Sequence, residues 1–236
     1  MSNPALAQQL TETLQLESPA IALAFVQQPP ENIPRFEGIV PAGCVFWRKA
    51  AEGTFYADVT DHENCPVGVH TLGLPLSEAI AAELGGLVVK MGEACYLDGA
   101  EVPNIPTVPG EKSGVVYGPL AVFELEPDAV LVWVTPQQAM LLQEATKATA
   151  WTGNSGAPTF GRPGCASIPA ALQSGGSVLS LGCTGMRTLT EISQNLLLTV
   201  LPRQVLGELT ANLQQIAAAN QAMQAFYNQK KLALIG

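Results

Sequence analysis

A Gly-Cys step that occurs twice constrains this chain more than any other feature of its sequence. Each step is followed at a similar distance by a glycine, a short strand and a loop with a second cysteine. The first unit runs through Gly43-Cys44, Gly53, residues 54–59 and Cys65. The second runs through Gly164-Cys165, Gly175, residues 177–181 and Cys183. We interpret the pair as an internal duplication with two cysteines in each half.

The segments around these units match as well. An apolar strand precedes each unit, at residues 20–26 and 129–134, and each strand is followed by a proline-led segment. Continuous apolar runs of this length are typical of strands covered on both faces. We therefore expect one α/β domain over residues 1–236, made of two pseudo-symmetric halves at about 18–90 and 127–215. A mixed central sheet, helices packed outside it and a long C-terminal helix complete the expected architecture.

Local signals place the remaining elements. Leu6, Leu10 and Leu14 recur at helical spacing after Ser2-Asn3-Pro4, which predicts an N-terminal helix. Ser77 has the position of an N-cap for a short helix over 78–84, which Gly85-Gly86 is expected to end. The other expectations are a surface loop over 98–114, a kinked strand or two edge strands over 115–125, and a helix over 137–148. An irregular loop over 152–164 and an amphipathic helix over 203–231 follow.

Composition excludes several classes of protein. Apolar residues make up 47% of the 236 and charged residues only 13%, which is typical of a packed globular chain. The net charge of −9 disfavours nucleic acids and anionic membranes, since both attract clustered lysine and arginine. No basic segment followed by an apolar core opens the chain, and no apolar run is long enough to span a bilayer. We expect a cytoplasmic protein whose cysteines are not in disulfides.

Four of the five cysteines lie in glycine- or proline-containing turns at the ends of expected strands: Cys44, Cys65, Cys165 and Cys183. If the halves pack about a pseudo-twofold axis, these turns meet and supply the four thiolates that an iron–sulfur cluster or a structural zinc requires. Separated ligands in flexible loops favour a cluster, with [4Fe–4S] as the first choice. Buried core thiols and reactive thiols are the alternatives. Cys95 has no counterpart in the other half and is expected to pack in the core.

Arg187 closes the turn that begins at Gly182-Cys183 and contains Gly185. Backbone N–H groups at Gly182 and Gly185, together with the guanidinium, are candidates for holding an anion or a negatively charged cluster. A surface salt bridge is the competing interpretation of Arg187. His62 and His70 flank Cys65, so a mixed cysteine and histidine site is a further option, although such histidines are more often solvated or hydrogen-bonded.

No common enzyme signature occurs in the chain. Nucleophile-elbow, P-loop, dinucleotide-binding and zinc-protease motifs are all absent from the sequence. The first functional hypothesis is therefore an iron–sulfur protein that transfers electrons or senses redox state or metal, with a redox partner protein. The second is a small-ligand binder or thiol enzyme with a pocket between the halves. The third is an interaction protein that forms a homodimer through its C-terminal helix.

The chain resembles the family called domain of unknown function 169 over nearly its whole length. The resemblance is carried by the first strand with its proline-rich exit, Cys44, the Cys65 turn, Tyr117-Gly118-Pro119-Leu120, residues 126–130, Gly161-Arg162 through Cys165, and residues 182–187. The chain departs from the pattern at Pro66-Val67-Gly68, where a glycine-richer turn is expected. The resemblance implies one complete family domain and, since the family has no assigned function, leaves the chemistry to the residues.

Overall fold

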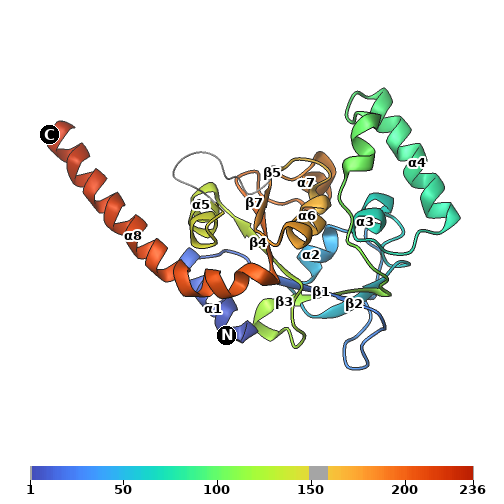
Figure 1. Ribbon diagram of the computed structural model, residues 1–236, viewed down its shortest axis with the longest axis horizontal. Helices are drawn as coiled ribbons and strands as arrows, with labels where there is room; N and C mark the ends of the chain where they lie inside the picture. The colour runs from blue at the N-terminus through green and yellow to red at the C-terminus, as the bar shows by residue number, and fades with distance from the viewer. Residues whose placement is uncertain (1, 149–158, 236) are drawn as a thin grey trace.

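The computed structural model describes residues 2–148 and 159–235 and is organised around one seven-stranded mixed sheet (Figure 1). Its strands, in the order β2-β3-β1-β4-β7-β6-β5, are Phe55–Asp58, Gly114–Pro119, Ile21–Val26, Ala129–Val134, Leu197–Pro202, Val178–Ser180 and Thr159–Phe160. Neighbouring strands are antiparallel except β5 and β6, which are parallel. The predicted α/β domain with a mixed sheet and a long C-terminal helix is confirmed.

Strands β1 and β4 pair at the centre of the sheet, and each begins an outward series with the same order. From β1 the series is β1-β3-β2, and from β4 it is β4-β7-β6, with every pairing antiparallel. Equal strand order is what a duplication would leave behind. Superposition of the two halves is a separate property, so the pseudo-symmetric repeat stays a prediction.

Helices cover both faces of the sheet. One face carries α2, α3, the 3₁₀ turn η3 with α6, and α7: Val45–Lys49, Pro66–Thr71, Gly164–Ala166 with Ser167–Ser174, and Thr184–Thr190. The other carries α1, the 3₁₀ turn η2, α5 and the first half of α8: Asn3–Leu14, Leu120–Val122, Pro136–Ala145 and Arg203–Ile235. The sheet therefore separates two apolar cores.

Strand β1 shows how the sequence sets up both cores. Ile21 and Leu23 point into the core beneath α2 and α6, whereas Ala22 and Ala24 point into the core beneath α1 and α5. Because side chains alternate along a strand, a continuous apolar run satisfies both faces at once. The N-terminal helix is also confirmed, since α1 begins at Asn3 and buries the predicted leucine face.

Two helices project from the body at opposite sides of Figure 1. The first is α4 (Glu78–Glu93), followed by the 3₁₀ helix η1 (Gly99–Asn104). The predicted cap is confirmed, because the Ser77 hydroxyl accepts a hydrogen bond of 3.2 Å from the Ile80 N–H. The predicted end at Gly85-Gly86 is wrong: the helix continues to Glu93, and apolar residues recur beyond the glycines on its inner face.

The second projecting helix is α8, whose four buried residues all lie in its first half, from Val205 to Ala217. Beyond them the helix extends away from the body, with Phe226 and Tyr227 more than half exposed. Within the described residues, no helix is both long enough and apolar enough to cross a membrane.

The segment that carries α4 leaves the body and returns to it at one point. Gly73 has a φ of 65°, and a Cβ there would clash with the carbonyl of Val108. The Val108 N–H donates to the Thr71 carbonyl at 2.9 Å. Lys112, which is 8% exposed, donates from Nζ to the carbonyls of Gly73, Val108, Pro109 and Gly110. Residues 74–107 thus form one excursion, which we call the α4 arm.

Candidate functional site

Four cysteines line one cavity, of about 450 Å³, on the face of the sheet that carries α2, α3, α6 and α7. Cys44 immediately precedes α2, Cys65 precedes α3, Cys165 lies in η3 and Cys183 precedes α7. The topology brings these helix starts together because all four short helices pack on one apolar core. The predicted set of four therefore shares one cavity, and the signal that found it was the paired Gly-Cys spacing.

Cys95 is placed differently from the other four. It follows the C-terminus of α4 with a φ of 53°, is exposed, and is not among the residues that line the cavity. The expectation that Cys95 packs in the core is therefore wrong, because the α4 arm carries it away from the sheet.

Backbone groups approach the sulfurs closely. The Met186 N–H donates to Sγ of Cys183 at 3.4 Å. Sγ of Cys65 lies only 2.9 Å from the position that a Cβ at Gly68 would occupy. Pro66, where the sequence departed from the family pattern, opens α3, whose first turn contains Gly68. Proline suits that position because the first helical residue needs no N–H donor.

Burial raises the pKa of three of these thiols. Burial is the main cause that raises the pKa of Cys44 to about 12, with neighbouring Cys65 and Cys183 adding to it. Burial likewise raises the pKa of Cys65, against the opposing effect of backbone groups at Gly43 and Gly68. It also raises the pKa of Cys165, where neighbouring Cys65 adds to it. A cation that bound here would displace protons from these thiols.

Helix α4 forms the roof of the cavity. Leu84, Leu87, Val88 and Met91 line it, whereas Val89 on the same helix does not and is 62% exposed. The spacing of the four places them on one helical face. Ile80 is the one residue of α4 that is buried in the core. Most of the apolar face of this helix therefore faces the cysteine cavity.

The far end of the α4 arm is attached beside Cys183. The Thr184 N–H donates to the Tyr96 hydroxyl at 3.3 Å. The guanidinium of Arg162 lies over the Tyr96 ring, 4.4 Å from its centroid. Both Arg162 and Tyr96 line the cavity. Sequence reasoning missed this pair, since nothing in the sequence joins an arginine before Cys165 to a tyrosine after α4.

Arg187 stabilises the turn around Cys183 through hydrogen bonds to backbone carbonyls. Its Nε donates to the Leu181 carbonyl at 2.9 Å, and one terminal nitrogen donates to the carbonyls of Leu181 and Leu196. Arg187 and Gly182 are not among the cavity-lining residues, whereas Gly185 is. The anion-holding role of these three residues stays a prediction, and the structural role of Arg187 is to fix the turn.

The two histidines have different surroundings. His62 is buried, with Nδ1 2.6 Å from the Asp58 carbonyl and Nε2 3.1 Å from the Tyr117 hydroxyl. Burial lowers its pKa, and the neutral ring suits this arrangement. His62 does not line the cavity, whereas His70 does. Within residues 2–148 and 159–235, no three histidine, cysteine or acidic side chains are gathered as a ready-made site for a single metal ion.

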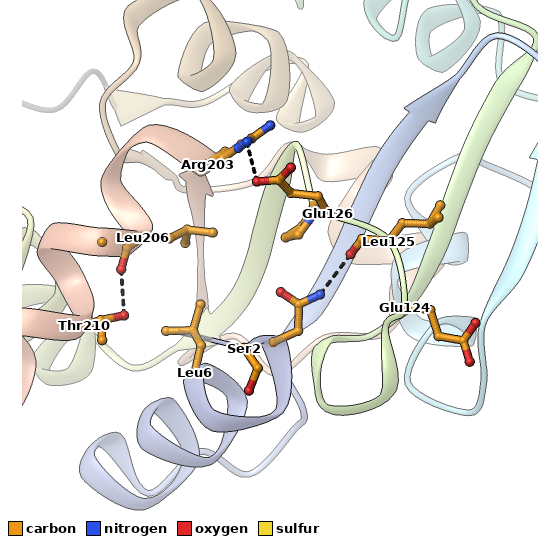
Figure 2. Close-up of a pocket in the computed structure, with 11 residues that line it drawn as sticks. Ser2, Leu6, Glu124, Leu125, Glu126, Arg203, Leu206 and Thr210 are labelled. Atoms are coloured by element: carbon orange, nitrogen blue, oxygen red, sulfur yellow. Dashed lines mark hydrogen bonds and ion pairs between the residues drawn. The ribbon is translucent and has the colours of Figure 1, made fainter.

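A second cavity, of about 540 Å³, lies between α1, the loop before β4 and the start of α8 (Figure 2). Two pairs of its polar groups bind each other within the protein: Arg203 with Glu126, and the Thr210 hydroxyl with the Leu206 carbonyl at 2.7 Å. This cavity holds no thiol. The smaller cavity is the better candidate site because four thiols, a histidine and an arginine converge on it.

The fold and site define a mixed α/β protein with a thiol-lined, helix-roofed cavity. The chain belongs to the DUF169 family, described as uncharacterised ArCR, whose model matches residues 9–212. The match includes all five cysteines and ends within α8, so the projecting half of that helix lies outside it. No curated protein and no solved structure matches the chain.

Proposed function

We propose that Cys44, Cys65, Cys165 and Cys183 bind an iron–sulfur cluster, in a protein that transfers electrons or senses redox state or metal. The observation that carries the proposal is that these four cysteines, and not the exposed Cys95, line one cavity. A [4Fe–4S] cluster takes one thiolate at each of four irons, whereas zinc gathers its ligands about a single ion. The shared cavity puts four thiols around one space, which is the number of thiolates that such a cluster requires.

The surroundings of the sulfurs also suit a cluster. When bound, it would supply one-electron chemistry at a potential set by hydrogen bonds to sulfur, net charge and solvent exposure. The Met186 N–H already donates to Cys183. The apolar roof from α4 would limit water at the site. A thiol enzyme is the alternative, and as in cluster binding the reactive species is the thiolate, which burial opposes at Cys44, Cys65 and Cys165 by raising their pKa.

Anaerobic purification and reconstitution test the proposal. The chain is purified without oxygen, incubated with ferrous iron, sulfide and thiol reductant, and desalted. We expect a brown protein with broad visible absorption and about four irons and four sulfides per chain. Protein that stays colourless and metal-free after this treatment would contradict the proposal. So would protein that binds zinc tightly and takes up no sulfide.

A further inference from the structure

The cavity has a second chemical character that the thiols do not explain. Its roof is an apolar helix face, continued by Leu97, Val102 and Ile105 of the same arm. A cluster needs four sulfurs and nearby N–H donors, and it does not need an aliphatic surface of this extent. The volume of about 450 Å³ lies within the range of about 300–1,000 Å³ that small-molecule sites occupy.

Charge at the cavity is opposite in sign to the charge of the chain. The whole protein has a net charge of −9, yet no described aspartate or glutamate lines the cavity. Arg162 is the one formally charged side chain among the described residues that line it, with His70 as the other basic group. Among the described residues, no carboxylate lies within ion-pair distance of Arg162.

The Tyr96 ring holds Arg162 in place. The guanidinium stacks on the ring, and the ring is fixed in turn by the bond from the Thr184 N–H to its hydroxyl. A stacked guanidinium keeps its edge N–H donors available for a carboxylate, sulfonate or phosphate oxygen. The cavity therefore combines a broad apolar wall with one oriented anion-binding group at its rim.

We infer that this cavity binds a small molecule with an apolar body and a single anionic group. The apolar body packs against Leu84, Leu87, Val88 and Met91 of α4, and the anionic group meets Arg162. This inference concerns the same cavity as the cluster proposal, but it depends on the α4 face and Arg162 and not on any thiol.

Two fluorescent probes that differ in charge test this inference. 1-Anilinonaphthalene-8-sulfonate has an aromatic body and one anionic group, and N-phenyl-1-naphthylamine has the same body without the charge. Each is titrated into the full chain. We expect saturable binding of one molecule of each probe per chain, with tighter binding of the anionic probe, an advantage that falls as salt is raised. Absence of saturable binding for both probes would overturn the inference.

Variants locate the probes. Leu87→Asp should weaken the binding of both probes by about tenfold or more, because it removes an aliphatic contact of the half-buried Leu87 and adds a charge. Val89→Asp, on the outer face of the same helix, should leave the binding affinity of both probes unchanged. Arg162→Gln should weaken the binding of only the anionic probe, by about fivefold, as expected for an ion pair at an exposed arginine. Phe226→Ser should also leave the affinity of both probes unchanged. That result would exclude the exposed apolar surface of α8 as the place where the probes bind.

Leu87→Ala serves as a milder variant if Leu87→Asp does not fold. It should weaken the binding of both probes by several-fold. Equal effects of Leu87 and Val89 substitutions would overturn the placement at the roof. Equal effects of Arg162→Gln on both probes would overturn the anion-binding role. Because the titrations need no iron, they also separate failure of this inference from failure of the cluster proposal.

Discussion

The imidazole Nε2 of His62 lies 3.1 Å from the hydroxyl of Tyr117, and the two side chains share the core with Phe46. Nδ1 of His62 donates to the carbonyl of Asp58, so Nε2 accepts from the tyrosine. A proton added at Nε2 would remove that acceptor inside an apolar core. We therefore predict that protonation of His62 destabilises the folded protein in acid.

Stability should therefore fall as the pH drops below the ordinary histidine pKa of 6.5. Burial lowers the pKa of His62 in the folded state, so the unfolded chain takes up a proton that the folded chain excludes. The contribution is fully present above 6.5 and is lost as the pH falls toward the folded pKa. Urea unfolding at several pH values between 7.5 and 5.5 measures the slope.

His62→Gln should flatten that slope, although it also lowers stability at every pH by removing two hydrogen bonds. His70→Gln is the matched control, and it should leave the slope close to that of the unchanged protein. An unchanged slope in His62→Gln would show that another group is responsible.

Gly68 is predicted to be essential for the position of the Cys65 sulfur. Gly68→Ala would put a Cβ 2.9 Å from Sγ, so the sulfur or the first turn of α3 must shift. We expect iron bound after reconstitution to fall to less than about half, because cluster ligation depends on sulfur position. Iron and sulfide assays measure the effect.

Gly85→Ala is the control for that substitution. Nothing lies within 4 Å of a Cβ at Gly85, which is inside α4. Alanine there should stabilise the helix by up to about 1 kcal/mol and leave bound iron unchanged. Similar iron contents for the two variants would contradict the role assigned to Gly68.

Lys112 is predicted to anchor the α4 arm. Lys112→Met removes a donor to four carbonyls at the base of the arm, two of them at Gly73 and Val108 where it leaves and returns. Hydrogen exchange should become at least about tenfold faster across residues 74–107, since each lost bond to a charged group is worth about 1.5–3 kcal/mol. Lys90→Met, at an exposed position of α4, is the control. Equal exchange in the two variants would contradict the anchoring role.

The second half of α8 is predicted to contribute little to folding. Nothing in that helix is buried beyond Ala217, and Asn220 makes the last hydrogen bond to the body, to Glu144. Deleting residues 222–236 should change the free energy of unfolding by no more than about 0.5 kcal/mol. Light scattering on both forms tests whether this segment supplies the expected homodimer contact. A large loss of stability in a chain that is monomeric before deletion would contradict the prediction.

Much of the fold was predictable because local signals agreed with tertiary packing. The leucines of α1 and the apolar runs of β1 and β4 are buried as their spacing indicates. The end of α4 was mispredicted because Gly85-Gly86 has the form of a C-terminal signal. Apolar residues such as Leu87 and Met91 face the cavity and extend the helix beyond those glycines.

The grouping of the four cysteines was also predictable, because a Gly-Cys step and a second cysteine recur at similar spacing in two parts of the sequence. What the sequence could not indicate is the α4 arm, whose folding back over the cysteines is a long-range contact without a local signature. Arg162 and Tyr96 meet only because of that arm. The closeness of Arg187 to Cys183 in the sequence predicted an anion-binding role for it, yet Arg187 donates hydrogen bonds to the carbonyls of Leu181 and Leu196.

The most direct test of the central proposal is the iron and sulfide content of five single cysteine-to-serine variants, each reconstituted without oxygen in parallel with the unchanged protein. Removing any one of Cys44, Cys65, Cys165 and Cys183 should sharply reduce bound iron and sulfide, because each supplies one of four ligands. Cys95→Ser should retain both, since that thiol is exposed and outside the cavity. Full iron content after loss of any two of the four, or a loss in Cys95→Ser as large as in the others, would contradict the four-cysteine site.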